Sequence, residues 1–190
     1  MLKGHLVNLR AVEEKDLPLL LSWRNDLESL YLWSTYRHID DESYGMEQIV
    51  IDLRRNRHVT FIIERKREKE PIGFIYSYEF SLSDRHCTVT TFISREYKSH
   101  GLGAEGHALF LNYLFSYYDL IKVYADIYEN NTFSLNASLR GGYIVEGRFP
   151  RHRFHNGEWL TMLRLALYRE NLDKVNKLIN RKSDIQTVSK

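Results

Sequence analysis

The chain has 190 residues, of which 43% are hydrophobic, and its 27 basic and 25 acidic side chains leave a formal net charge of +2, which argues against a nucleic-acid partner or a membrane surface. This length predicts a single globular domain over residues 1–190, with its core within residues 5–168 and a C-terminal helix and tail over 169–190. The single Cys87 excludes an internal disulfide, no cysteine and histidine spacing fits zinc, and no run approaches the roughly 20 apolar residues of a membrane span, so we expect a cytoplasmic protein without a metal site.

The first half of the chain predicts two helical segments and an antiparallel meander. Acidic residues before Leu17 mark the start of one helix, and Asp40 and Asp41 are candidates for capping a second. The aromatic and hydroxyl residues of 31–36 interrupt the helical pattern and predict a loop. Alternating or β-branched runs predict strands over residues 5–12, 58–65, 71–80 and 86–94.

The second half predicts a parallel crossover. A helix runs from about Leu102 through residue 115, and another ends at Gly141 and Gly142. Strands are predicted over residues 121–128, 143–149 and 159–168, followed by a helix over 172–179. Since a helix separates 86–94 from 121–128, these two strands are expected to lie parallel in one sheet.

Three glycines, Gly101, Gly103 and Gly106, stand where the crossover helix begins. The first N–H groups of a helix lack internal partners and attract anions, and glycine lets the backbone approach a phosphate closely. The string G-L-G-A-E-G fits a dinucleotide fingerprint, but the preceding meander does not, and no Lys-Ser or Lys-Thr follows as a P-loop requires. This stretch alone does not distinguish a phosphate-binding loop from a tight turn.

Two longer motifs carry a resemblance to a known family. K-S-H-G-L-G-A (98–104) resembles the acyl-CoA loop [R/Q]-x-x-G-x-[G/A] of GNAT-superfamily N-acetyltransferases, with Lys98 in place of Arg or Gln. N-N-T-F-S-L-N-A-S-L-R-G-G-Y-I-V-E-G (130–147) resembles the N-x-x-S…[K/R]-x-G-[F/Y]-x-x-E-G signature of the RimJ/RimL-like (ribosomal-protein N-acetyltransferase-like) branch. L-L-S-W-R-N-D (20–26) is also similar to a segment of that branch.

The resemblance implies an α/β (mixed α+β) fold and a coenzyme. The GNAT fold has a mostly antiparallel sheet of six to seven strands, splayed between strands 4 and 5 and flanked by helices, with acetyl-CoA in the gap. The residues implied to contact the coenzyme are Thr91, Phe92, Ile93, Lys98, Ser99, His100, Gly101, Leu102, Gly103, Ala104, Asn131 and Ser134. Ser134 matches the hydroxyl that protonates the departing thiolate, although Ser134 and Asn131 equally fit a helix cap.

The general base is where this chain departs from the family pattern. The two positions at which related enzymes carry a glutamate hold Arg153 and Thr88 here. His152 and His155 flank Arg153 and titrate near neutral pH, so both are candidate catalytic residues. Strand alternation would place His152 on the opposite side from Arg153 and His155. In the alternative interpretation, both histidines lie on the surface without a catalytic role. A chain of water molecules would then accept the proton of the amine.

The acceptor is expected to be a small molecule with a primary amine, such as an amino sugar, a nucleotide-linked amino sugar or an amine antibiotic. Trp33, Tyr36, Tyr76, Tyr78 and Arg153 are predicted to bind it. The basic run from Arg148 to His155 favours an anionic acceptor. A protein N-terminus as the acceptor, or a non-catalytic acyl-CoA-binding module, remains as an alternative. The chain is expected to be a monomer or a homodimer.

Overall fold

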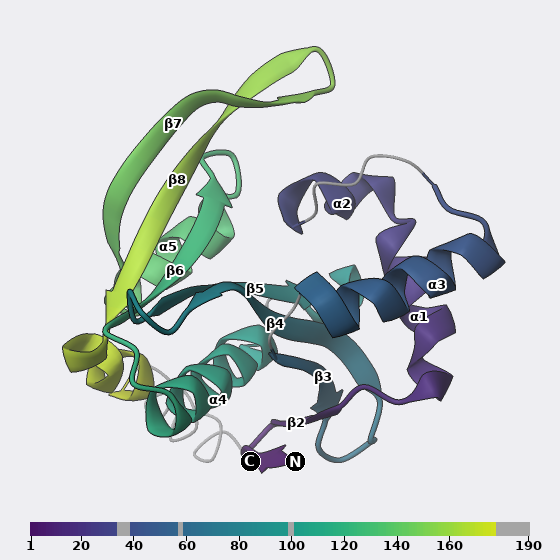
Figure 1. Ribbon diagram of the computed structural model, residues 1–190, viewed down its shortest axis with the longest axis horizontal. Helices are drawn as coiled ribbons and strands as arrows, with labels where there is room; N and C mark the ends of the chain where they lie inside the picture. The colour runs from purple at the N-terminus through teal and green to yellow at the C-terminus, as the bar shows by residue number, and fades with distance from the viewer. Residues whose placement is uncertain (34–38, 57–58, 99–100, 178–190) are drawn as a thin grey trace, which may run out of the picture.

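The computed structural model describes residues 1–33, 39–56, 59–98 and 101–177, and it is built on one eight-stranded sheet (Figure 1). The strand order is β1-β2-β3-β4-β5-β6-β8-β7, and every neighbouring pair is antiparallel except β5 and β6. The strands are β1 Leu2–Lys3, β2 Val7–Ala11, β3 Val59–Arg65, β4 Pro71–Ser81, β5 His86–Ile93, β6 Lys122–Tyr128, β7 Ile144–His155 and β8 Glu158–Tyr168. The mixed sheet is as predicted, and the eighth strand is the short β1.

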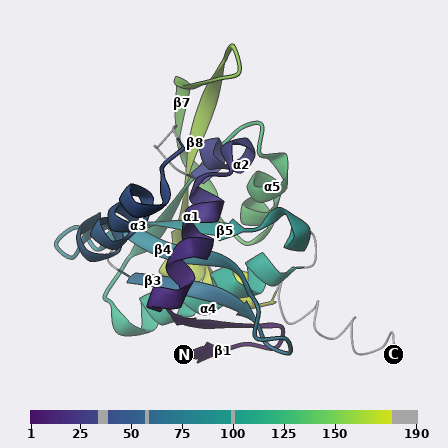
Figure 2. The ribbon, with the colours of Figure 1, turned by 90° about the vertical axis from the view of Figure 1, so that its right-hand side faces the viewer.

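Helices cover both faces of the sheet (Figures 1 and 2). They are α1 Leu17–Arg24, α2 Leu27–Trp33, α3 Glu42–Ile51, α4 Leu102–Tyr117 and α5 Thr132–Arg140, and residues 172–177 are also helical. Short 3₁₀ or π turns occupy Glu14–Asp16, Asp52–Asn56, Arg95–Tyr97 and Arg169–Asn171. Asp41 caps α3 by accepting a hydrogen bond from the N–H of Tyr44, as its place in the sequence predicts.

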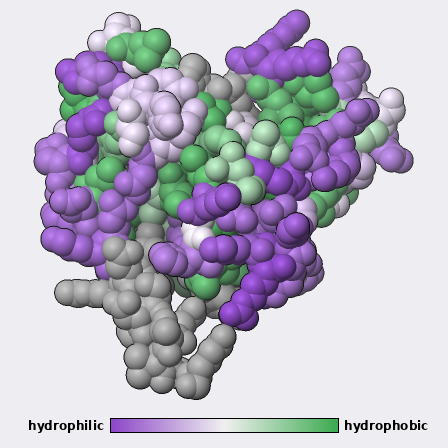
Figure 3. Space-filling view, turned by 90° about the horizontal axis from the view of Figure 1, so that it is seen from below, coloured by the Kyte–Doolittle hydropathy of each residue, from purple (hydrophilic) through white to green (hydrophobic). Residues whose placement is uncertain are grey.

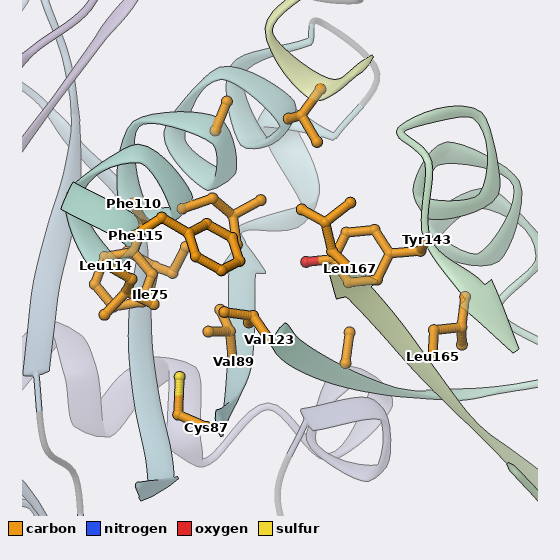
Figure 4. Close-up of a cluster of buried hydrophobic side chains, with 14 of the residues drawn as sticks. Ile75, Cys87, Val89, Phe110, Leu114, Phe115, Val123, Tyr143, Leu165 and Leu167 are labelled. Carbon is orange, nitrogen blue, oxygen red and sulfur yellow. The ribbon is translucent and has the colours of Figure 1, made fainter. Parts of the chain in front are cut away.

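Each face of the sheet buries its own apolar cluster. Phe110 and Leu114 of α4 pack against Ile75, Cys87 and Val89 on one face, and Figure 4 shows these side chains meeting. Leu21 of α1 and Ile49 of α3 pack against Phe74, Tyr76 and Phe92 on the other face. Burying one such side chain contributes about 1.5–3 kcal/mol. Burial also raises the pKa of the Cys87 thiol to about 12, so Cys87 acts as a small apolar residue.

The sheet splits between β5 and β6. The two strands pair only from His86↔Lys122 to Thr88↔Tyr124, in the described part of the chain. Beyond Thr88, β5 continues along β4 to Ile93, whereas β6 continues along β8 to Tyr128. Figure 1 shows β6, β7 and β8 turning away from the other strands. The splay expected between the fourth and fifth predicted strands is therefore confirmed.

Two segments differ from the sequence prediction. Residues 31–33 complete α2 instead of forming a loop, because Asp26 caps this helix and Leu30 is buried; residues 34–36 lie outside the described part. The strand predicted over 143–149 continues to His155, because residues 153–155 pair with 158–160 across the Asn156-Gly157 turn. β7 and β8 thereby form a long hairpin that projects from the sheet (Figure 1).

In the described residues, no helix is long and apolar enough to cross a bilayer. Hydrophilic and hydrophobic residues are interspersed over the face seen from below in Figure 3. The same residues contain no group of three or more histidine, cysteine or carboxylate side chains placed to hold a metal ion.

Glu105 fastens the N-terminal segment to α4. Its side chain is buried, and its carboxylate accepts hydrogen bonds from the N–H groups of His5, Leu6 and Val7 at 2.5, 2.8 and 3.1 Å. We expect Glu105→Ala to lower the free energy of unfolding by about 2–4 kcal/mol, because three backbone donors lose their acceptor. Urea unfolding measures this change. Glu47→Ala, at an exposed position of α3, should stay within about 0.5 kcal/mol of the wild type, and an equal loss in both variants would contradict the assignment.

Candidate active site

Two helices begin at one end of the split. Because β5 and β6 are parallel, their C-terminal ends lie at the same end of the sheet, and each is followed by a helix. Gly101 precedes α4 with φ of 78°, a conformation that favours glycine. Asn131 precedes α5 and accepts a hydrogen bond from the N–H of Ser134 at 3.3 Å. The first turns of both helices present backbone donors, so this end of the split suits an anion.

The expected coenzyme residues lie around this end of the split. Thr91, Phe92 and Ile93 form the last part of β5. Lys98 is exposed just after the turn Arg95–Tyr97, and residues 101–104 lead into α4. The side chain of Leu102 is buried in the core, so its contribution is restricted to backbone atoms. Ser99 and His100 lie outside the described residues.

The glycines of α4 let the helix approach the sheet. A Cβ on Gly103 would lie 2.9 Å from Cγ1 of Ile93, and one on Gly106 would lie 3.3 Å from Cδ1 of Ile63. Gly103 therefore sets the distance between α4 and the end of β5, beside the split, whereas Gly106 packs on the sheet. The side of Gly103 on which a Cβ would lie faces Ile93.

His107 connects the two halves of the split sheet, and the sequence analysis missed it. Its Nδ1 lies 2.8 Å from Oγ1 of Thr91 on β5, and its Nε2 lies 2.7 Å from the hydroxyl of Tyr143, just before β7. Figure 4 shows Tyr143 reaching into the core from the α5 side. Burial lowers the pKa of His107 to about 4, so at neutral pH one ring nitrogen donates and the other accepts. No sequence motif marks this residue.

A cavity of about 470 Å³ lies beside the split on the α1 face. Residues of α1, α2 and α3 with the following turn line one side, and residues of β4 to β8 line the other. Trp33, Tyr76, Tyr78 and Arg153, four of the predicted acceptor residues, contribute to its wall, and Tyr36 lies outside the described residues. Trp33 meets Phe74 edge to face at 5.1 Å, which gives the cavity an aromatic side.

The predicted catalytic residues are not brought together. His152 lines the cavity, and its Nδ1 lies 3.0 Å from the hydroxyl of Tyr128. His155 stacks on Tyr31 at 3.8 Å and is not among the described residues that line the cavity, and neither is Ser134, at the start of α5.

The expectation that His152 and Arg153 lie on opposite sides of the strand is wrong. Between Phe149↔Met162 and Arg153↔Leu160, three residues of β7 stand opposite one residue of β8, and Arg151 has φ of 53°. This bulge resets the alternation, so both side chains reach the cavity. Arg153 is 7% exposed, lies 4.7 Å from the ring centre of Tyr128, and donates a hydrogen bond to the carbonyl oxygen of Tyr31.

The cavity contains carboxylates as well as guanidinium groups, and the sequence analysis did not identify the carboxylates. Asp52, Glu79 and Asp126 line it together with Arg24, Arg153 and Arg164. Arg164 binds Asp126 through two hydrogen bonds of 2.7 and 2.8 Å, and Nη1 of Arg24 lies 3.4 Å from Asp52. Asp126 interrupts an apolar run in β6, a signal that the sequence offers.

The basic run of β7 does not form one cationic wall. His152 and Arg153 face the cavity, but Arg151 is exposed, and Arg148 pairs with Glu129 at 2.9 Å. The geometry therefore does not support an anionic acceptor, which the sequence analysis inferred from this run.

The split sheet and its two helix ends define an acyl-CoA-dependent transferase, and comparison with known proteins gives the family. The model of the acetyltransferase (GNAT) domain family matches residues 7–144, so the chain belongs to this family and is an acetyltransferase that uses acetyl-CoA. The residues at the split fit such a coenzyme. β5 has an edge that β6 leaves unpaired in the described structure, two helices begin at the same end, and Gly103 lets α4 lie close to the end of β5. The assignment to the GNAT superfamily, made from the two motifs, is confirmed.

Relatives of this chain include spermidine N(1)-acetyltransferases. That of Escherichia coli (strain K12) is 25% identical over 170 residues, which cover 88% of this chain and 89% of the relative. That of Vibrio cholerae serotype O1 is 22% identical over 163 residues, covering 85% and 92% of the two chains. These relatives act on a polyamine, whereas the motifs resemble the RimJ/RimL-like branch.

Solved structures share the fold. A spermidine N-acetyltransferase from Vibrio cholerae, in complex with CoA and spermine, matches with a TM-score of 0.80 and 20% identity, over 88% of this chain and 98% of that one. A GNAT acetyltransferase from Bacillus anthracis matches with a TM-score of 0.75 and 18% identity, over 89% and 98%.

Gly103→Val tests the position of the coenzyme. We expect the dissociation constant for CoA to rise about tenfold or more, because the new side chain meets Ile93 and moves the start of α4 away from the end of β5. Isothermal titration calorimetry measures the constant. Gly106→Ala is the matched control, because its new methyl group contacts Ile63 away from the end of β5. It should change the dissociation constant for CoA by less than about threefold. Unchanged affinity in Gly103→Val would place the coenzyme elsewhere.

His107 gives the stability a predictable dependence on pH. The pKa of His107 in the folded protein, about 4, lies below its ordinary value of 6.5. The contribution of this neutral side chain to the free energy of unfolding is therefore fully present above pH 6.5 and is lost as the pH falls toward 4. Between pH 7 and pH 4.5 this group should lower the free energy of unfolding by about 2–3 kcal/mol. Urea unfolding at both values should show a smaller decrease in His107→Gln, and identical decreases would refute the assignment.

Proposed function

We propose that this acetyltransferase N-acetylates a primary amine of a small aliphatic polyamine, and that the amine reaches the split from the cavity on the α1 face. The observation that carries the proposal is the position of the cavity. Thr90 of β5 and Asp126 of β6 line it from the two sides of the split. A coenzyme held at the ends of α4 and α5 would then present its acetyl group at the split, within reach of an amine in the cavity.

Acetyl-CoA supplies the acetyl group as a thioester, and residues of this chain would hold it. We assign its pyrophosphate to Lys98 and the start of α4, where backbone N–H groups and the helix dipole favour an anion. Its pantetheine chain would lie along the edge of β5 at residues 91–93, which β6 leaves unpaired in the described structure. Asn131 and Ser134 would lie beside this chain, with the Ser134 hydroxyl as proton donor to the departing sulfur.

Charge in the cavity supports a cationic acceptor of more than one amine. Asp126 and Glu79 lie near the split, while Asp52 follows α3 on the opposite wall. Carboxylates at both sides of a cavity would attract ammonium groups at both ends of a flexible chain. Arg164 and Arg24 partly neutralise them, so we expect moderate affinity. The spermidine acetyltransferases among the relatives support the same class.

Tyr78 would orient the reacting amine. Burial, together with the negative charge of Asp126, raises the pKa of Tyr78, so its hydroxyl stays protonated. A protonated phenol in the cavity wall can donate a hydrogen bond or accept one from an amine, but it cannot act as the base. Trp33 and Phe74 would exclude water beside it.

We also propose that residues 1–190 work as one domain in the cytoplasm, where acetyl-CoA and polyamines are available. The assembly is a separate question: a monomer or a homodimer was expected from the sequence, and one related structure, the spermidine N-acetyltransferase of Vibrio cholerae, is described as dodecameric.

An amine panel tests the proposed function. Release of CoA thiol from acetyl-CoA should be followed with spermidine, spermine, putrescine, glucosamine, a nucleotide-linked amino sugar and a peptide with a free N-terminus. We expect kcat/KM for spermidine or spermine to exceed that for glucosamine by about tenfold or more, because only the polyamines place a second ammonium group opposite the first. Mass spectrometry of the product should show one added acetyl group.

Other outcomes of the panel contradict the proposal in distinct ways. Turnover restricted to the peptide would assign a protein N-terminus as the acceptor. CoA binding without thiol release from any amine would assign a non-catalytic acyl-CoA module.

A further inference from the structure

A β-bulge turns Glu79 toward the cavity. β4 pairs with β5 at Tyr78↔Thr88 and again at Ser81↔His86, so two residues of β4, Glu79 and Phe80, stand opposite one residue of β5. Glu79 has φ of 47°, a conformation that is uncommon for a residue other than glycine. Such strain persists where the surrounding structure holds it, often at functional sites.

The bulge changes which face Glu79 occupies. Phe74, Tyr76 and Tyr78 alternate onto the cavity face of β4, so regular alternation would send Glu79 to the α4 face. Because of the extra residue, both Tyr78 and Glu79 line the cavity, and Phe80 takes the α4 face against Tyr118 at 4.9 Å. The sequence pattern alone therefore assigns Glu79 to the wrong side of the sheet.

The carboxylate of Glu79 lies at the point where the sheet splits. Its Oε2 accepts a hydrogen bond from the hydroxyl of Thr88 at 3.1 Å, and Thr88 belongs to the last residue pair that joins β5 to β6. β4 therefore supplies a carboxylate at the end of the ladder between β5 and β6.

The surroundings keep this carboxylate available. Nη2 of Arg164 lies 3.8 Å from Oε2 of Glu79, but the same guanidinium is held by Asp126 at 2.7 Å. The side chain of Glu79 is 59% exposed, whereas that of Asp126 is 16% exposed. The other titratable groups on the wall formed by β4 to β8 are Tyr76, Tyr78, Tyr128, His152 and Arg153. Glu79 is therefore the carboxylate of the wall that is least engaged by a cation.

We propose that Glu79 is the general base of the acetyl transfer, resting on the proposed function above. Its carboxylate takes one proton from the ammonium group of the acceptor. The neutral amine nitrogen forms the C–N bond as the C–S bond of the thioester breaks, the amine gives up its second proton to solvent, and the thiolate takes up one proton. Thr88 is the positioning residue, because its hydroxyl donates a hydrogen bond to the carboxylate. His152 is the competing candidate, and its Nδ1 is already engaged with Tyr128.

Glu79→Gln tests the base without removing the hydrogen bond, because the amide oxygen can still accept from Thr88. With the amine that the wild type acetylates fastest, we expect kcat to fall about 100-fold, with KM for the amine and the dissociation constant for CoA changed by less than about threefold. The pH profile supplies a second readout. In the wild type kcat/KM should rise with pH and then level off, whereas in Glu79→Gln it should keep rising until the amine itself is neutral.

Glu79→Asp and Glu47→Gln are the matched variants. Glu79→Asp retains a carboxylate and should recover more activity than Glu79→Gln, while Glu47→Gln, at an exposed position of α3 outside the cavity lining, should keep kcat within about threefold of the wild type. Thermal unfolding of all three verifies that the bulge and the fold persist. A kcat of Glu79→Gln within about threefold of the wild type, or a larger loss in His152→Gln than in Glu79→Gln, overturns the proposal.

The two proposals fail in different ways. If the wild-type chain acetylates no amine, the proposed function fails and the base fails with it. If the wild type acetylates an amine and Glu79→Gln is undiminished, the function stands and Glu79 is not the base.

Discussion

The structure depends on how little β5 and β6 pair with each other. Their ladder comprises the pairs from His86↔Lys122 to Thr88↔Tyr124, after which each strand follows a different neighbour. Had the pairing continued, the sheet would be closed and would have no site for an extended ligand. Because it stops, the backbone edge of β5 from Val89 to Ile93 faces the split, and an extended amide chain can occupy it as an added strand would. The parallel direction of the two strands also places the N-termini of α4 and α5 at one end of the same opening.

An open split must be held at a fixed width, and side chains on the α4 face do this. His107 bonds to Thr91 on one half and to Tyr143 on the other. Apolar side chains of α4 pack against β5, and Leu165 and Leu167 of β8 join the same cluster (Figure 4). The α4 side of the split is thus held by hydrogen bonds and apolar packing, while residues of α2 and of the long β7–β8 hairpin line the cavity on the opposite face.

The sequence predicted the parts of this arrangement that are encoded locally. Alternation and β-branched residues gave the meander, and the glycines before an apolar helical pattern gave the crossover and the helix end near Gly101. That Trp33, Tyr76 and Tyr78 line one cavity was expected from the family resemblance. Strand bulges account for the main errors. In β7 the bulge brings His152 to the same side as Arg153, and in β4 it brings Glu79 to the cavity. A bulge leaves little trace in a hydrophobic pattern, yet it changes the side of the sheet on which the neighbouring side chains lie.

Hydrogen exchange of the backbone amides tests most directly whether the split holds the coenzyme. Exchange of the full chain should be compared with and without acetyl-CoA, and resolved by mass spectrometry at the level of single peptides. The account predicts slower exchange with acetyl-CoA at residues 89–93 and 101–104, since a bound ligand would cover the edge of β5 and the first turn of α4. Amides of β2 and β3, remote from the split, should be unaffected. Protection that leaves residues 89–93 and 101–104 unchanged while appearing elsewhere would contradict the account.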